Sequence, residues 1–365
     1  MYNRLLRNID KTLIIAVALI LIIGLSSVFS ATHSEGSSTS REGLFLRQIM
    51  WIAVGLILAF IIVHVDYQKF VDSAYIIFGL NILLLIVVLV YGHTRLGAQR
   101  WVVIAGVGFQ PSEFVKISFI LALSAYLGHR AKFSYQPPDL AVSFGLMFIP
   151  LVLIFLQPDL GTALMLIPIV FAMLFVRGAS VKHLLALITI GLLSSPLLWM
   201  MMKGYQKQRL SVFINPNADP LGAGYTIIQS KIAIGSGFLF GKGWLSGTQN
   251  QLNFLPERHT DFIFSVIGEE GGLIGCALLI GLYCVLIYRG LRIAQTTGDT
   301  YGKLMATGIV TMLACQIIVN IGMASGFMPV VGLPLPLMSY GGSSLLTTLV
   351  SLGLLVNIGM RRPRF

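Results

Sequence analysis

The sequence contains few charged residues. Asp, Glu, Lys and Arg make up 11% of its 365 residues, whereas ordinary globular chains carry about 25%. Hydrophobic residues reach 56%, too many for a water-facing globule, which excludes a soluble enzyme and a disordered chain. The three cysteines, Cys276, Cys284 and Cys315, lie in apolar stretches without metal-ligand spacing, which excludes a disulfide scaffold. The composition indicates a protein that crosses a membrane several times.

The charge balance is basic, with 25 Lys and Arg against 14 Asp and Glu and a net charge of +11. In a soluble chain this excess would suggest a nucleic-acid partner. In a membrane protein, Lys and Arg gather instead in cytoplasmic loops beside the spans. We therefore expect no nucleic-acid partner.

Long apolar runs occur throughout the chain. A helix needs about 20 apolar residues to cross the hydrocarbon core. The sequence contains ten such candidates, near 12–30, 47–64, 73–91, 111–128, 139–156, 161–176, 184–202, 263–288, 304–324 and 341–360. We expect an all-α polytopic membrane protein whose residues 1–365 form a single integral membrane domain. The first apolar run exceeds that of a usual signal peptide, so we expect a retained helix.

The positions of Lys and Arg predict the orientation of the spans. With the N-terminus in the cytoplasm, basic residues such as Arg4 and Arg7 lie inside, and the short outside loops hold only Arg41, Arg47, Arg95 and Arg100. The loop between spans seven and eight, about 203–262, is long, and long loops cross largely regardless of charge. Both termini are then cytoplasmic. The Gly/Pro-rich and charged segments 92–110, 203–262 and 325–340 lie outside, where we expect the active face.

Two clusters place ionisable residues in or beside apolar spans, where a charge is costly and indicates function. Glu113 and Lys116 are three residues apart on one helix face and can pair, which also allows a helix-start pair that only neutralises itself. Asp159 interrupts an apolar stretch between Pro158 and Gly161. It either caps the following helix in a tight turn or points into the bundle and pairs with Lys116.

A third cluster precedes the span that begins near residue 263. It holds four ionisable side chains in five residues: Glu257, Arg258, His259 and Asp261. Helix caps would explain one acid, but not the whole cluster. A carboxylate at the membrane edge beside Arg and His suits a general base acting on a bound hydroxyl. Further along, Glu269 and Glu270 line the bundle interior or its far end.

Segment 332–344 combines prolines and glycines at membrane depth. Such backbone is tolerated where it lines a cavity, although a simple outside loop is the alternative. Cations on the outer side could clamp phosphate groups of a lipid carrier, or serve merely as interface anchors. The candidate phosphate ligands are Arg100, Arg209, Lys231, Lys242 and Arg258.

Six motifs together resemble the SEDS (shape, elongation, division, sporulation) family across essentially the whole chain, and its elongation members most. They are PSEFVK at 111–116, QPDLGT at 157–162, DPLGAGY at 219–225, IQSKIA at 228–233, LPERHTDF at 255–262 and PLPLMSYGGS at 334–343. The resemblance implies a peptidoglycan glycosyltransferase that polymerises lipid II on the outer face of the bacterial cytoplasmic membrane, with undecaprenyl pyrophosphate leaving.

The resemblance also implies roles for residues and partners. Asp261 is the expected catalytic residue, as general base or as ligand of a divalent cation, Mg²⁺ or Mn²⁺, and no organic cofactor is expected. The expected substrate-binding residues are Glu113, Lys116, Asp159, Arg100, Arg209, Lys231, Glu257, Arg258, His259 and Ser339. The expected partners are a class B penicillin-binding protein, which is a transpeptidase, other elongation-complex membrane proteins, lipid II and nascent glycan.

Two other functions fit the residues alone. A transporter that flips lipid II or another anionic lipid would use Glu113, Lys116 and Asp159 as its coupling or substrate site. A flippase should carry functional polarity on both faces, whereas this chain concentrates polarity outside. A non-catalytic scaffold for cell-wall enzymes would leave the cluster around Asp261 unexplained.

Overall fold

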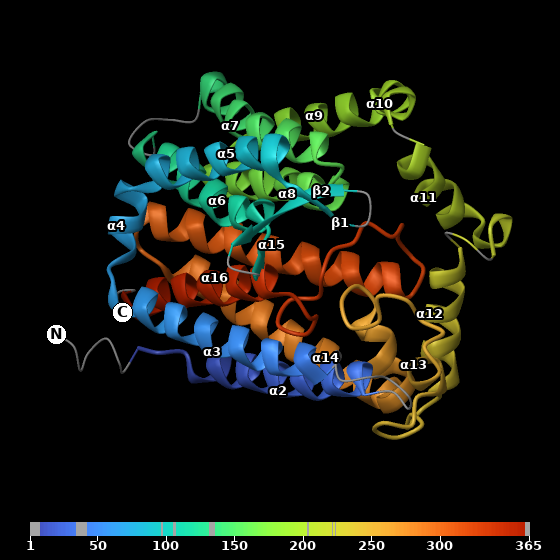
Figure 1. The fold of residues 1–365 in the computed structure, drawn as a ribbon. Helices are drawn as coiled ribbons and strands as arrows, with labels where there is room; N and C mark the ends of the chain where they lie inside the picture. The colour runs from blue at the N-terminus through green and yellow to red at the C-terminus, as the bar shows by residue number, and fades with distance from the viewer. Residues whose placement is uncertain are drawn as a thin grey trace.

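The structure is a computed structural model that describes residues 8–33, 42–95, 98–104, 107–130, 136–202, 204–220, 222 and 224–361. Arg4, Arg7 and Arg41, which contribute to the predicted orientation, lie outside the described residues, as does the side chain of Arg95. The long helices run side by side (Figure 1).

The elements follow one another along the chain with short connections. They are α2 (Lys11–Thr32), α3 (Glu42–His64), α4 (Tyr67–Asp72), α5 (Ala74–Tyr91), β1 (His93–Arg95), β2 (Ala98–Ile104), β3 (Val107–Phe109), α6 (Pro111–His129), α7 (Pro137–Leu156), α8 (Leu160–Arg177), α9 (Val181–Leu193), α10 (Ser195–Met201), α11 (Gly204–Ile214), η2 (Pro216–Ala218), α12 (Tyr225–Ser236), α13 (Thr248–Gln251), α14 (Ile263–Thr296), α15 (Thr300–Ala324) and α16 (Gly342–Arg361).

Within the described residues, eight helices are long and apolar enough to cross a membrane, namely α2, α3, α5, α7, α8, α14, α15 and α16. The chain is therefore an integral membrane protein, as its composition predicts. The expected span 111–128 coincides with α6, a 19-residue helix. The expected span 184–202 is divided between α9 and α10. The number of ten membrane crossings stays a prediction.

The helices differ in how much of their surface faces other helices. In α16 83% of the spanning window is buried within the protein, and in α15 67%, whereas in α3 the share is 11%. Most of α6 is also buried, including its polar residues. Since lipid tails are as apolar as leucine side chains, α3 leaves its apolar residues on the outer surface without penalty. Helices α6, α15 and α16 form the centre of the bundle, and buried polar side chains gather there.

Segment 92–110, expected as an outside loop, forms a small antiparallel sheet in the order β1-β2-β3. Arg95 pairs with Ala98 in the first hairpin, and Ile104 pairs with Val107 in the second. Helices dominate the chain as predicted, and this small sheet was not predicted. The sheet brings Arg100 on β2 toward the start of α8.

Helix α14 extends to Thr296, beyond the predicted end near residue 288, and breaks at Gly272, where φ is 60°. This left-handed conformation favours glycine. The break frees backbone groups, and a neighbouring loop binds them: Leu273 N donates to Phe238 O (2.9 Å) and Ile274 N donates to Leu239 O (3.2 Å). The irregular backbone is thus buried in protein and satisfied.

The ends of the described chain meet at one end of the bundle, where Asn8 Nδ2 donates to Met360 O (3.2 Å). Segment 203–262, expected as a long loop, contains α11, η2, α12 and α13 and lies at the opposite end, beside the strands (Figure 1). The polar segments singled out in the sequence therefore gather at one end, away from the chain ends.

Candidate active site

Asp261 lies in a turn directly before α14. The amide groups of Thr260 and Asp261 both donate to Glu257 O (3.1 Å each), which closes the turn. Glu257 has φ 49°, and its exposed side chain accepts a hydrogen bond from Thr260 Oγ1 (3.2 Å). Phe262 is buried and anchors the turn on the bundle. This arrangement leaves the carboxylate of Asp261 half-buried at the mouth of the helix bundle.

Segment 331–340 runs alongside this turn and is joined to it by two hydrogen bonds and a ring contact. Ser339 Oγ donates to Thr260 O (2.5 Å), and Tyr340 N donates to His259 O (2.8 Å). The ring of His259 lies 5.8 Å from that of Tyr340. Ser339 is therefore bonded to the backbone beside Asp261, and we assign it a role in the architecture of the site. Its direct contact with substrate stays a prediction.

The surroundings of Asp261 change its acidity. Burial, followed by the negative charge of Glu257, raises the pKa of the Asp261 carboxyl from 3.8 to about 6, and the positive charges of Arg209 and Arg100 act in the opposite direction. A carboxylate with this pKa is a stronger base than an ordinary one and is still mostly ionised at pH 7. Asp261 therefore has the properties of a general base.

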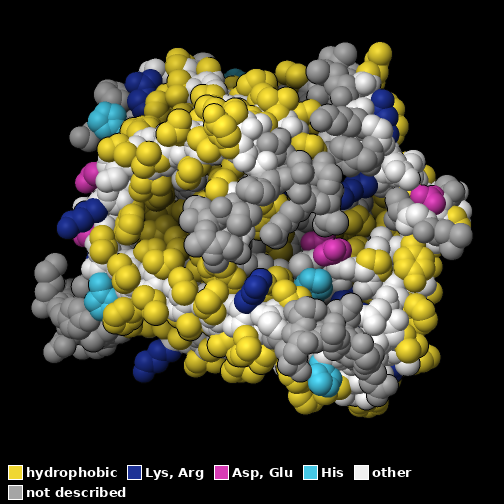
Figure 2. All heavy atoms as spheres, in the orientation of Figure 1, with side chains coloured by type: hydrophobic (Ala, Val, Ile, Leu, Met, Phe, Trp, Pro, Cys, Tyr) yellow, Lys and Arg dark blue, Asp and Glu magenta, His cyan; other side chains and the backbone are white. Residues whose placement is uncertain are grey.

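Three expected cations belong to elements around this mouth. Arg209 of α11 is exposed, and its Nη1 donates to Val330 O (3.1 Å). Lys231 of α12 is also exposed and passes over Gly326, where a Cβ atom would lie 2.6 Å from Nζ. Arg100 donates through Nε to Gln157 O (3.1 Å). Figure 2 shows acidic, basic and histidine side chains at both ends of a largely apolar face, this end included.

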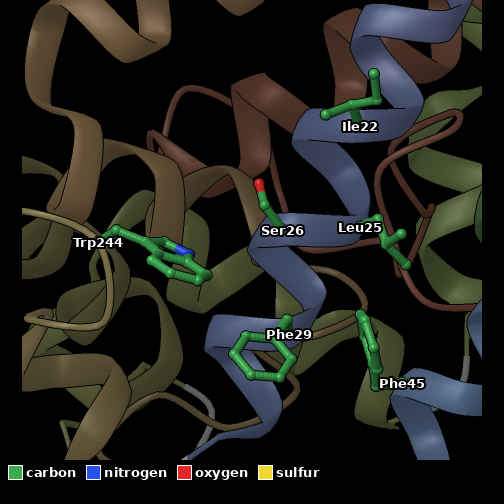
Figure 3. A pocket seen from close by; sticks show the side chains of 6 residues that line it. All are labelled: Ile22, Leu25, Ser26, Phe29, Phe45 and Trp244. Atoms are coloured by element: carbon green, nitrogen blue, oxygen red, sulfur yellow. The ribbon is translucent and has the colours of Figure 1, made fainter.

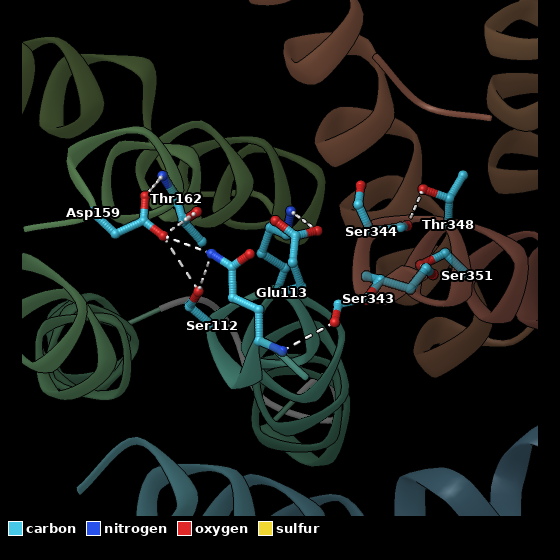
Figure 4. Close-up of polar contacts among 11 residues, drawn as sticks. Ser112, Glu113, Asp159, Thr162, Ser343, Ser344, Thr348 and Ser351 are labelled. Carbon is cyan, nitrogen blue, oxygen red and sulfur yellow. Dashed lines mark hydrogen bonds and ion pairs between the residues drawn. The ribbon is translucent and has the colours of Figure 1, made fainter. Parts of the chain in front are cut away.

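Asp159 caps α8 and joins a polar cluster (Figure 4). One of its oxygens accepts from Thr162 N (3.3 Å), and the other accepts from Ser112 Oγ (3.3 Å) and Gln110 Nε2 (3.1 Å). Arg100 forms an ion pair with it at 3.7 Å. The cap is therefore correct, but the predicted pair between Asp159 and Lys116 is wrong. The partners of Asp159 come from β2 and from the start of α6 and α8.

Lys116 pairs with Glu113 instead, at 2.9 Å, as their spacing predicts. Both side chains are fully buried in the centre of the bundle, and Nζ has no other partner within the described part of the chain. The pair is one helical turn from Ser112, which contacts Asp159. Among the described residues, no hydrogen bond or ion pair joins Glu113 or Lys116 to Asp261.

Two other expected phosphate ligands are already engaged. Lys242 pairs with Glu269 (2.9 Å), and this buried carboxylate also accepts from Gln249 N and Asn250 N. Arg258 is buried, and its Nε donates to Ala31 O of α2 (2.7 Å). Both cations join loops to helices, and their binding of substrate stays a prediction. Glu269 faces the bundle interior, one of the two predicted locations.

The carboxylates at the mouth of the bundle could bind a divalent cation only together with oxygen atoms of a substrate. Within the described ranges, no group of three or more His, Cys, Asp or Glu side chains could hold a metal ion. Mg²⁺, however, is commonly bound by one or two carboxylates together with substrate phosphates. Asp261 and the neighbouring Glu257 fit this mode. A metal at Asp261 stays a prediction.

A separate apolar pocket of about 400 Å³ lies between α2, α3 and the loop that carries Trp244 (Figure 3). Its lining residues are Ile22, Leu25, Ser26, Phe29, Phe45 and Trp244, none of which belongs to the predicted site.

The sequence did not indicate two residues that contact Asp261. Gly332 has φ 74°, and a Cβ atom there would lie 3.4 Å from Asp261 Oδ2. Asn320 of α15 donates to the carbonyl oxygen of Asp261 (3.0 Å). Both lie some 60 to 70 residues further along the chain, so the only available signals were a buried amide in a span and a glycine in a proline-rich segment.

The chain is similar to known proteins over nearly its whole length. A family described as cell cycle protein, which groups FtsW, RodA and SpoVE, matches residues 10–363. The peptidoglycan glycosyltransferase MrdB of Escherichia coli K12 is 40% identical over 359 residues, covering 97% of this chain and 94% of the relative. The peptidoglycan glycosyltransferase RodA of Treponema pallidum is 34% identical, covering 97% of this chain and 98% of the relative.

Solved structures resemble the fold as well. A chain from a peptidoglycan synthase complex that coordinates polymerisation and crosslinking has a TM-score of 0.81 and 36% identity, covering 96% of this chain and 97% of its own. The rod shape determining protein RodA of Thermus thermophilus has a TM-score of 0.73 and 34% identity, with 98% of each chain covered.

Proposed function

The chain belongs to the FtsW, RodA and SpoVE family of cell cycle proteins, and from this membership we infer that it is a peptidoglycan glycosyltransferase. We propose that it polymerises lipid II during cell-wall elongation. In this reaction the 4-hydroxyl of one lipid II attacks the anomeric carbon at the reducing end of the growing glycan. A C–O bond forms there, and the bond from that carbon to undecaprenyl pyrophosphate breaks.

Asp261 is the proposed general base. Its ionised carboxylate accepts the proton of the attacking hydroxyl while the new bond forms. The observation that carries this assignment is the placement of the carboxylate, half-buried in a turn at the mouth of the bundle, where burial and Glu257 also raise its pKa to about 6. Positioned bases of this kind typically contribute about 10²–10⁴-fold to the rate.

The leaving pyrophosphate requires positive charge. Arg209 and Lys231 are exposed and reach the same segment, 325–332, from α11 and α12. We propose that these two bind the pyrophosphate, and that Arg100 acts on it from the other side while it also holds Asp159. In the alternative role of Asp261, this carboxylate and Glu257 would hold Mg²⁺ or Mn²⁺, and the cation would supply the charge for the phosphate oxygens in place of base catalysis by Asp261.

The location and partner follow from the same site. We propose that the protein lies in the bacterial cytoplasmic membrane with both chain ends inside and the Asp261 end outside, where lipid-linked precursors are polymerised. The described chain ends meet at the opposite end of the bundle, which supports this orientation. Similarity to a chain of a peptidoglycan synthase complex supports a partner that crosslinks, and we propose a class B penicillin-binding protein.

The test uses purified protein with lipid II in liposomes, with and without the transpeptidase partner, in the presence of Mg²⁺ or Mn²⁺. We expect glycan ladders from the wild type and none from Asp261→Asn. Asp66→Asn is the matched control, because it changes a carboxylate that caps α4 at the other end of the bundle and asparagine caps equally well. Ladders from Asp261→Asn would refute the base. Absence of ladders from all three proteins would favour lipid transport.

A further inference from the structure

A buried asparagine joins the two segments that form the site. Asn320 lies near the end of α15 and is 0% exposed. Its Nδ2 donates one hydrogen to Asp261 O (3.0 Å) and the other to Leu333 O (2.7 Å). Both hydrogens of the amide are therefore used on backbone carbonyls of separate segments. The carbonyls belong to the turn before α14 and to segment 331–340.

These two hydrogen bonds fix the distance between the backbone of Asp261 and that of Leu333, and this distance affects where the carboxylate of Asp261 lies. Leu333 follows Gly332, the residue whose missing side chain leaves 3.4 Å to Asp261 Oδ2. The amide of Asp261 is held separately by Glu257 O (3.1 Å). The N–H of Asp261 donates one hydrogen bond and its carbonyl oxygen accepts another, so the backbone of Asp261 is held on both sides. Asn320 supplies the bond that also holds the facing segment.

We propose that Asn320 is a positioning residue for the proposed base: it holds the backbone of Asp261 against that of Leu333, so that the carboxylate is kept beside Gly332. The inference rests on the proposed function, since it assigns Asn320 a role in the reaction of Asp261. Asn320 itself touches no reacting atom. Groups that orient a reacting side chain typically change activity about 10–100-fold when they are removed.

The effect on the reaction has a definite direction. Without the amide, the carbonyls of Asp261 and Leu333 lose their shared donor, and the turn is held to segment 331–340 only by the bonds from Ser339 and Tyr340 to Thr260 and His259, which lie on the far side of Asp261 from α14. The carboxylate then becomes more hydrated, which favours its ionised form. The charged groups that act on it, Glu257, Arg209, Arg100 and Asp159, are unchanged in sequence. A change in the pH profile therefore reports the position of the carboxylate.

The experiment compares Asn320→Leu with Asn357→Leu in lipid II polymerisation, followed across pH 5–8, and in thermal unfolding. Asn357 is a matched control because it is also 0% exposed, lies in a central helix, and donates through Nδ2 to Ile62 O (2.5 Å) and to Val65 O at the far end of the bundle. Asn320→Ser is a second variant that keeps one donor if Asn320→Leu does not fold. Asp261→Asn is included.

We expect Asn320→Leu to lower kcat about 10–100-fold with KM within about threefold of the wild type, and to move the acidic limb of kcat to lower pH. The kcat of Asn320→Ser should lie between that of Asn320→Leu and that of the wild type. Asn357→Leu should unfold at a lower temperature yet keep the kcat and pH profile of its folded fraction. If both Asn320 variants kept the wild-type kcat and pH profile while Asp261→Asn was inactive, the positioning role alone would be overturned. An active Asp261→Asn would overturn the proposed function first.

Discussion

The acidity of Asp261 gives the sharpest prediction, because two neighbours of opposite charge act on it. The base must be ionised to accept a proton, so activity rises as pH increases through about 6. Glu257 raises this pKa, so Glu257→Gln should move the acidic limb to lower pH. Arg209 lowers it, so Arg209→Gln should move the limb to higher pH. The two substitutions thus have opposite signs on one measured quantity.

The size of the effect follows from Coulomb's law with exposed partners. Both Glu257 and Arg209 are exposed, so an effective dielectric constant of about 40–80 applies. Unit charges roughly 7 Å apart then interact by about 0.6–1.2 kcal/mol, or about 0.4–0.9 pH unit. At pH 6, removal of either charge therefore changes the ionised fraction of Asp261 by an amount that rate measurements resolve, and the two removals change it in opposite directions.

The assay measures initial rates of lipid II polymerisation at saturating substrate between pH 5 and 8. Saturation separates the pH effect of Arg209 from its proposed binding of pyrophosphate, which would raise KM. Lys207→Gln on the same helix is the control, because Lys207 is not among the charges that act on Asp261. Higher ionic strength should shrink both displacements. Displacements of the same sign, or none for either variant, would refute the electrostatic origin of the acidic limb.

Two further predictions concern close packing and buried charge. Gly332→Ala places a methyl group 3.4 Å from the carboxylate oxygen at φ 74°, so kcat should fall about tenfold while the protein still inserts and folds, as polymerisation rates and thermal unfolding would show. Lys116→Met leaves Glu113 as an uncompensated buried charge and should cost about 3–5 kcal/mol of stability. The double variant Lys116→Met with Glu113→Leu should recover most of this loss in denaturant titrations, and a failure to recover would exclude charge as the cause.

Local patterns in the sequence predicted the parts of the site that depend on helix geometry. The pair of Glu113 and Lys116 follows from a spacing of three residues on one helix, and it forms as expected. Asp159 caps α8 because it directly precedes the first helical turn. Its predicted pairing with Lys116 failed because that inference needed the relative positions of α6 and α8. Asp159 instead contacts Gln110, Ser112 and Arg100.

Contacts between distant segments could not be predicted from spacing. Asn320 lies 59 residues beyond Asp261, and nothing in the apolar pattern of α15 distinguishes it from an amide that faces another helix. The strands at 92–110 were missed for a different reason. A search for runs of about 20 apolar residues does not detect strands of three to seven residues. Both omissions concern elements that bring side chains to the outer mouth.

The acidity of Asp261 also explains why the mouth carries charges of both signs. Folding raises this pKa from 3.8 to about 6, so the ionised carboxylate is disfavoured in the fold, and stability is lost as pH rises through this interval. Without the arginines, burial and the charge of Glu257 would raise the pKa of Asp261 further and leave more of the carboxylate protonated at neutral pH. Arg209 and Arg100 oppose burial, and at pH 7 the ionised form then exceeds the protonated form about tenfold. We propose that the same arginines bind the pyrophosphate, so that the charge that keeps the proposed base ionised also serves the leaving group.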